Sequence, residues 1–286
     1  MTSFAILILS VFICGGLKAQ DNATSNEPVE YTYKIVGSDS LKAYVFIPQQ
    51  VSNKDKQPSI VIFHGGGWVM GEPSWGFGHA KRFTKLGLVS IVAQYRLSDQ
   101  KNTTPIDAMS DARDLIIWTR ENSKDLGICK DSIVAYGWSA GAHLIASSAV
   151  FPDFNSDSSI SSIPNALVLH SPALSLVNDG WFKKLLLYRG VPVDYSPAEN
   201  IKGSLPPSII VVGKDDTVTP VEESVLFHNN TLKYGNISYL HIYDGVGHLF
   251  TPSDQPDNEW PNPDKEVLSR AFNEIDLFLK GLDYIK

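Results

Sequence analysis

The chain has little cysteine, and its two cysteines do not suggest a disulfide. Among 286 residues only Cys14 and Cys129 carry a thiol. Cys14 lies in an N-terminal segment that we expect to be removed, which would leave Cys129 without an internal partner. Stability must then come from a hydrophobic core, and the apolar content of 43% is ordinary for a globular protein.

The chain also has no run of basic residues. Its 24 Lys and Arg are outnumbered by 31 Asp and Glu, giving a net charge of −7. Nucleic acid and anionic membranes attract proteins through clustered positive charge. We therefore expect neither as a partner.

No hydrophobic run is long enough to cross a membrane. Residues 4–16 are apolar, about the length of a signal-peptide core and too short for a span. Ala19 offers a small residue for cleavage, although no Lys or Arg precedes the run. We predict a signal peptide at residues 1–19, a polar leader at 20–30, and a secreted or periplasmic protein. The alternative is a retained anchor.

The rest of the chain alternates short apolar runs with amphipathic stretches. Two runs around Gly37 predict an N-terminal β-hairpin over residues 31–47. Further buried strands are predicted at residues 59–63, 88–95, 133–136, 166–170, 208–212 and 237–243, and helices at 79–86, 105–123, 219–233 and 264–282. This pattern is typical of an α/β domain, here residues 31–286, with a mostly parallel sheet and helices on both faces. The irregular residues 171–200 follow a strand and predict a small cap insertion.

Ser139 lies in Gly137-Trp138-Ser139-Ala140-Gly141, between an apolar run and an alanine-rich stretch. A Gly-x-Ser-x-Gly sequence between a strand and a helix typically raises a serine hydroxyl for attack on a carbonyl. Ser139 is therefore the predicted nucleophile. The competing interpretation is an ordinary serine at a helix N-terminus.

A serine hydroxyl needs a base, and His248 is the candidate. It follows the last predicted strand in a glycine-rich loop, and an imidazole can both take and return a proton near neutral pH. A carboxylate after residues 208–212 would orient this histidine. Asp215 and Asp216 are both candidates for this carboxylate. The competing role for a loop aspartate is to cap a turn or the next helix.

Three consecutive glycines follow the strand at residues 59–63, in His64-Gly65-Gly66-Gly67-Trp68. Such a loop can turn its backbone N–H groups toward a ligand, so Gly66 and Gly67, with the N–H of Ala140, predict an oxyanion hole. A phosphate-binding loop is excluded by spacing, because Met70 stands where Gly-x-Gly-x-x-Gly requires glycine. The chain order of serine, aspartate and histidine is that of α/β-hydrolases.

Together these motifs resemble α/β-hydrolase esterases with an HGGGW oxyanion loop, the group that includes hormone-sensitive-lipase-like and feruloyl or acetylxylan esterase-like enzymes. Asp111 and Trp118 on the preceding helix also match. In that family the acid lies in Gly-x-x-Asp-x-x-Val-Pro, which selects Asp216 over Asp215. The resemblance implies a triad of Ser139, Asp216 and His248 and acyl transfer through an acyl-enzyme, with no metal or cofactor.

The expected substrate is a small-molecule or polysaccharide ester with a short-chain or aromatic acyl group. This rests on predicted export and on aromatic residues near the expected cleft, where rings can stack on sugars or aryl groups. Packing in the core is the competing role for these rings. The aromatic residues are Trp68, Trp138 and Trp181, which are the predicted substrate contacts, and also Trp75 and Phe77.

Two other functions share these motifs. A serine peptidase of the prolyl-oligopeptidase type has the same order of triad residues, but it normally carries a large N-terminal propeller, which this sequence lacks. A non-catalytic binding protein on a hydrolase scaffold would usually have lost a triad member, and all three are present here.

Overall fold

The computed structural model describes residues 27–49, 56–99, 102–152, 159–256 and 258–286. The predicted signal peptide lies outside these residues, as does the leader up to residue 26. Within the described ranges, no helix has both the length and the apolar character needed to cross a bilayer.

An eight-stranded sheet in the order β1-β2-β4-β3-β5-β6-β7-β8 forms the centre of the molecule. β1 pairs with β2, and β2 with β4, in antiparallel fashion, whereas all later neighbours are parallel. The predicted hairpin and mostly parallel sheet are thus confirmed. The strands are β1 (Val29–Val36), β2 (Asp39–Phe46), β3 (Gln57–Phe63), β4 (Val89–Ala93), β5 (Ile128–Trp138), β6 (Ala166–His170), β7 (Ser208–Gly213) and β8 (Ser238–Tyr243).

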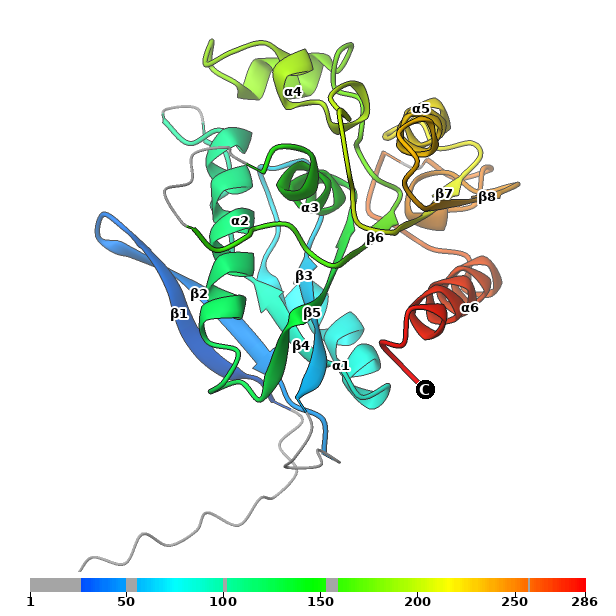
Figure 1. Cartoon of the computed structure of the whole chain (residues 1–286). Helices are drawn as coiled ribbons and strands as arrows, with labels where there is room; N and C mark the ends of the chain where they lie inside the picture. The colour runs from blue at the N-terminus through cyan, green and yellow to red at the C-terminus, as the bar shows by residue number, and fades with distance from the viewer. Residues whose placement is uncertain (1–26, 50–55, 100–101, 153–158, 257) are drawn as a thin grey trace, which may run out of the picture.

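Helices cover both faces of this sheet (Figure 1). They are α1 (Phe77–Lys85), α2 (Pro105–Glu121), α3 (Ala140–Val150), α4 (Gly180–Leu185), α5 (Val221–Lys233) and α6 (Lys265–Gly281). α2, α3 and α5 pack in one apolar cluster, and α1 and α6 in the other. Alternate residues of a buried strand serve the two clusters: Val61 belongs to the first, and Ile60 and Ile62 to the second. Strands buried on both faces explain the short, wholly apolar runs in the sequence.

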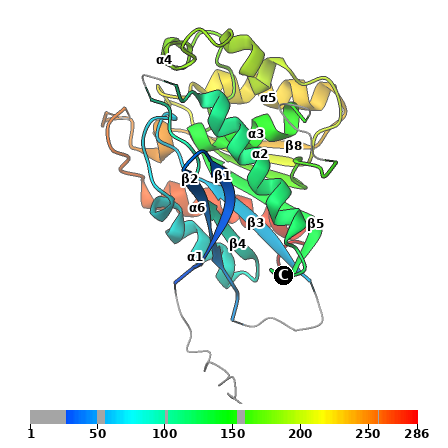
Figure 2. The ribbon, with the colours of Figure 1, turned by 90° about the vertical axis from the view of Figure 1, so that its left-hand side faces the viewer.

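Residues 171–200, for which the sequence predicts a cap, lie on the α3 side of the sheet and are called the cap below. This segment contains α4 and the short 3₁₀ helices η2 (Pro192–Tyr195) and η3 (Pro197–Glu199). In both views α4 lies at the top of the molecule (Figure 1 and Figure 2). Phe182 of α4 is fully buried in the same cluster as α2 and α3, which fixes the cap to the domain. The Asp179 carboxylate caps α4 by accepting the N–H groups of Trp181 and Phe182.

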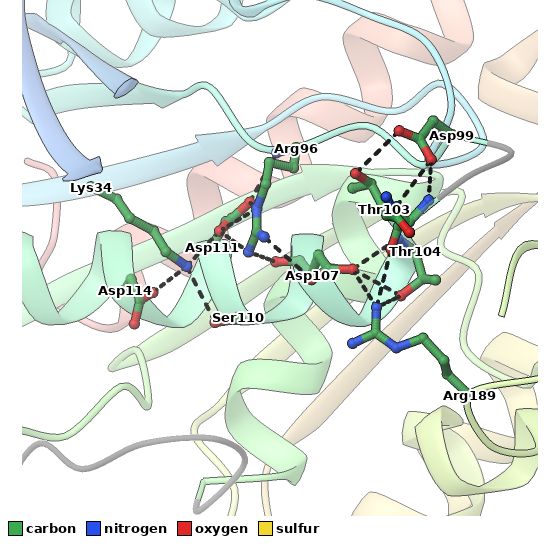
Figure 3. A network of polar contacts seen from close by, with 11 residues as sticks. Lys34, Arg96, Asp99, Thr103, Thr104, Asp107, Ser110, Asp111, Asp114 and Arg189 are labelled. Atoms are coloured by element: carbon green, nitrogen blue, oxygen red, sulfur yellow. Dashed lines mark hydrogen bonds and ion pairs between the residues drawn. The ribbon is translucent and has the colours of Figure 1, made fainter. Parts of the chain in front are cut away.

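A polar network along α2 ties the hairpin and the cap to the domain (Figure 3). Asp111 is fully buried and accepts hydrogen bonds from the Arg96 guanidinium and, at 2.6 Å, from the Lys34 ammonium of β1. One turn earlier, Asp107 pairs with Arg96 and with Arg189 of the cap, at 3.2 and 3.0 Å. One helix face therefore holds three segments that are distant in sequence.

Candidate active site

Ser139 occupies a sharp turn between β5 and α3. Its backbone has φ 54° and ψ −124°, a region that costs a non-glycine residue roughly 1–3 kcal/mol. A Cβ on Gly137 would lie 2.6 Å from the backbone of Gly141, and one on Gly141 would lie 2.2 Å from the Phe63 carbonyl oxygen. The turn thus has room only for glycine at these two positions, as the Gly-x-Ser-x-Gly sequence predicts.

The structure brings His248 and Asp216 beside this serine. The Nε2 atom of His248 lies 3.1 Å from the Ser139 Oγ atom, and its Nδ1 atom lies 3.0 Å from Asp216 Oδ2. All three side chains are buried. A proton on Nδ1 shared with the carboxylate leaves Nε2 as the acceptor for the serine hydroxyl. Asp215, the alternative acid, instead accepts a hydrogen bond from Ser253.

Thr219 contacts both Asp216 and His248, an arrangement that the sequence did not indicate. Its Oγ1 atom lies 2.9 Å from Asp216 Oδ2, 3.2 Å from His248 Nδ1 and 3.0 Å from the Ser171 carbonyl oxygen. Its backbone N–H also donates to Asp216 Oδ1. The Ser171 hydroxyl accepts the N–H of Leu249, next to the histidine. These contacts fix the imidazole and carboxylate against rotation.

The glycine loop lies against the same site. Gly66 and Gly67 have φ of 117° and 56°, and both line a cavity together with Ser139 and His248. A Cβ on Gly66 would lie 2.0 Å from the Met70 carbonyl oxygen, so the loop can adopt this course only with glycine there. Ala140, the third predicted oxyanion donor, is the first residue of α3, where a backbone N–H has no partner within the helix.

His64 supports this loop from behind. Its ring is buried, stacks on Tyr95 at 4.4 Å, and its Nδ1 atom lies 2.7 Å from the Gly65 carbonyl oxygen. The Tyr95 hydroxyl donates to the His64 carbonyl oxygen at 2.8 Å. Burial lowers the pKa of His64, so the ring is neutral at neutral pH. The histidine of HGGGW therefore serves the backbone geometry of its own loop.

The cavity over Ser139 has a volume of about 1090 Å³, enough for a drug-sized or disaccharide-sized ligand. Its walls come from the glycine loop, the cap, the start of α5 and the residues before α6. His170, at the end of β6, is among them, and burial lowers its pKa to about 3. Four acidic residues also line the cavity: Asp179, Glu222, Glu223 and Glu259. Among the described lining residues there is no lysine or arginine.

The predicted aromatic contacts divide into two groups. Trp181 is 46% exposed and lines the cavity, and its indole N–H donates to the Gly67 carbonyl oxygen at 3.1 Å. Trp138 and Trp68 also line it, but they are only 8% and 3% exposed. The Trp68 indole N–H is already bonded to His143 Nδ1, and its ring packs on Phe182, so this residue mainly supports the loop.

The sequence also predicts Trp75 and Phe77 near the cleft. Trp75 does line the cavity, edge to face with Trp260, which is 70% exposed and was not predicted. Phe77 is absent from the cavity wall and packs on Tyr44 and Phe46 instead, so its expected place near the cleft is wrong. Phe77 is the first residue of α1, and this helix turns the ring toward β2.

A family model described as BD-FAE matches residues 45–165. Among curated proteins, the chain is similar to endo-1,4-beta-xylanase B of Butyrivibrio fibrisolvens, 27% identical over 74% of this chain, and to an arylesterase of Saccharolobus solfataricus, 26% identical over 48%. The matched regions span only 35% and 44% of those two proteins.

A solved structure gives a fuller match. Esterase 2 of Thermogutta terrifontis, in its apo form, is 32% identical with a TM-score of 0.79, over 91% of this chain and 96% of that chain. In its form phosphoramylated by tabun the TM-score is 0.81. Because this match is above 30% identical and covers nearly all of both chains, the chain belongs to the carboxylic ester hydrolases of the α/β-hydrolase fold.

Proposed function

We propose that this protein is an exported serine esterase that hydrolyses short-chain or aromatic acyl esters, including those carried by polysaccharides, with Ser139, Asp216 and His248 as its catalytic triad. The observation that carries the proposal is the continuous hydrogen-bonded line from Asp216 through His248 to Ser139 at the floor of a large cavity. The structures of Thermogutta terrifontis esterase 2 with propionate and with butyrate bound support a short acyl chain.

The reaction would run in two steps. Ser139 Oγ attacks the ester carbonyl carbon while His248 Nε2 takes the hydroxyl proton, and Asp216 stabilises the resulting imidazolium. The backbone N–H groups of Gly66, Gly67 and Ala140 would hold the oxyanion. Collapse of this intermediate breaks the bond to the alcohol, which leaves with the proton from His248.

Hydrolysis of the acyl-enzyme repeats the sequence with water. His248 Nε2 takes a proton from water as its oxygen attacks the acyl carbon. The second tetrahedral intermediate then breaks the bond to Ser139 Oγ, and His248 returns the proton to that oxygen. The carboxylic acid is released and the enzyme is restored, so no net proton remains on the triad.

Covalent labelling tests the nucleophile directly. A fluorophosphonate probe should label the wild-type protein once, at Ser139, and should not label Ser139→Ala. The phosphorylation of Thermogutta terrifontis esterase 2 by paraoxon is a precedent for this chemistry in a similar fold. The wild type should also hydrolyse 4-nitrophenyl acetate. An unlabelled, inactive wild type would refute the proposal, and turnover of aminoacyl anilides alone would indicate a peptidase.

A further inference from the structure

Glu223 lies on the first turn of α5, on the wall of the cavity that contains Ser139 and His248. The reaction described above does not use it. An ionisable side chain that is partly buried in the wall of a cavity usually has a partner or a function. What surrounds Glu223 indicates which group of a substrate it can bind.

One oxygen of this carboxyl group is fixed by the protein. Glu223 Oε2 accepts the backbone N–H groups of Leu174 and Ser175, at 3.1 and 3.3 Å. The preceding residue, Ala173, has its own N–H 3.5 Å from the Ser139 carbonyl oxygen. Consecutive Cα atoms are only about 3.8 Å apart, so the carboxyl group lies within about 10 Å of the Ser139 backbone.

The second oxygen, Oε1, has no hydrogen-bond partner among the residues that the structure describes, and it is not sealed from solvent. A side chain anchored through one oxygen presents the other to the cavity in a fixed position. Burial raises the pKa of Glu223 to about 8. At neutral pH the carboxyl group is therefore present in both forms, the acid able to donate and the carboxylate able to accept.

A hydroxyl group is the partner that suits both forms, because it can donate and accept. A negatively charged partner is disfavoured, because three other carboxylates line the same cavity: Asp179, Glu222 and Glu259. Trp181 and Trp260 add exposed ring surface, on which the apolar face of a sugar can rest.

We propose that Glu223 is a specificity-determining residue whose Oε1 atom hydrogen-bonds a hydroxyl group in the alcohol part of the ester. Acetyl, propionyl and butyryl groups carry no hydroxyl group, so in an ester of such an acid the hydroxyl group belongs to the alcohol. The preferred substrates are then uncharged, polyhydroxylated alcohols bearing a short acyl group. This inference rests on the proposed esterase function.

A matched pair of esters tests it: methyl mono-O-acetyl-β-D-xylopyranoside, and tetrahydropyran-3-yl acetate, in which the ring carries no hydroxyl group. The wild type should favour the first by at least about tenfold in kcat/KM, since the carboxyl group is left unpaired by the second. Glu223→Leu should lower that ratio by about tenfold. Glu223→Gln retains an acceptor for the two N–H groups and a donor for the cavity, so its ratio should stay within about threefold of wild type.

Glu222→Leu is the matched control, because Glu222 is the neighbouring residue on α5 and lines the same cavity without a backbone anchor. Its ratio should change by less than about threefold. An equal loss on both esters in Glu223→Leu would show a merely structural anchor, and an equal change of ratio in Glu222→Leu would show a general charge effect. Either result overturns the inference.

The wild type alone keeps the inference testable if Glu223→Leu does not fold, because equal kcat/KM for the two esters would overturn it. Failure of the esterase proposal would look different. In that case Ser139 would remain unlabelled and neither ester would be hydrolysed, and both proposals would fall together. A labelled enzyme that hydrolyses the two esters equally would overturn only the role of Glu223.

Discussion

At the scale of single residues, the proposed acid of the triad is distinguished from its neighbour by its contacts. Asp216 is buried and accepts from His248, Thr219 and the N–H of Val218. Among the residues that the structure describes, the Asp215 side chain makes none of these contacts and instead accepts a hydrogen bond from the Ser253 hydroxyl. The two adjacent carboxylates therefore have different contacts, and a pair of variants can test whether their effects on activity differ.

We expect Asp216→Asn to lower kcat on 4-nitrophenyl acetate by about 10³–10⁴-fold, with KM within about threefold. The amide keeps the shape of the side chain but favours the wrong tautomer of His248 and cannot stabilise its charged form. Asp215→Asn, which removes the neighbouring charge, should keep kcat within about twofold. Similar losses in both variants would contradict the assignment of Asp216.

The sequence was sufficient to predict residues whose neighbours in the chain determine their role. Ser139, the loop glycines and the strand ends are local patterns, and the structure places them along one cavity. Thr219, Glu223 and the burial of Trp68 depend on contacts between segments distant in sequence, such as Thr219 with Ser171 and Trp68 with His143. No spacing rule links those positions, so the sequence did not predict these contacts.

At the scale of elements, the polar network along α2 is centred on one buried carboxylate, beside the apolar packing of the same helix. Asp111 accepts from the Arg96 side chain, the Arg96 backbone N–H and the Lys34 ammonium, and its side chain is fully buried. Asp114, one turn later on the same helix, pairs with the same lysine but is 38% exposed. The two residues share an ion-pair partner and differ in burial.

We expect Asp111→Asn to lower the free energy of unfolding by about 3 kcal/mol, because it leaves Arg96 and Lys34 without their buried counter-charge. Asp114→Asn should cost less than about 1 kcal/mol, as exposed ion pairs do. Urea unfolding followed by circular dichroism measures both. Equal shifts in the midpoint would show that burial of Asp111 does not determine the strength of the network.

The elements themselves were largely predictable. The helix expected at residues 105–123 is α2 (Pro105–Glu121), and the one at 264–282 is α6 (Lys265–Gly281). The cap was expected to be irregular, yet it contains α4, a helix of six residues. Its sequence is too short to show a helical period, and it is stabilised by the Asp179 cap and by burial of Phe182.

At the scale of the whole molecule, three histidines with lowered pKa values make stability depend on pH. Burial lowers the pKa of His143 to about 4, of His79 to about 4 and of His170 to about 3. In the unfolded chain these groups titrate near 6.5. The unfolded state therefore binds more protons between about pH 6.5 and 4, and stability falls as pH decreases through that range.

Glu223 acts in the opposite sense. Its pKa of about 8 in the folded protein lies above that of an unfolded glutamate, so its contribution to stability decreases as pH rises from about 4.5 to 8. Below pH 6.5, the combined effect of the three histidines on the free energy of unfolding is larger than the opposite effect of Glu223. The most stable range should accordingly lie near neutrality.

We expect the free energy of unfolding to fall by about 2–4 kcal/mol between pH 6.5 and 4.5. Urea unfolding at pH 4.5, 5.5, 6.5 and 7.5 measures the slope. His170→Gln removes one of the titrating groups, so its slope over this range should be smaller than that of the wild type, whatever its absolute stability. A wild-type profile that is flat below pH 6.5 would contradict the prediction.

The hydrogen bond from the Trp181 indole to the Gly67 carbonyl oxygen joins the cap to the oxyanion loop. The cap cannot swing outward without releasing the Gly67 peptide from this contact. Widening the entrance for a bulky alcohol therefore loosens the same donors that would stabilise the charged intermediate. The position of the cap and the geometry of the glycine loop are therefore coupled through a single hydrogen bond.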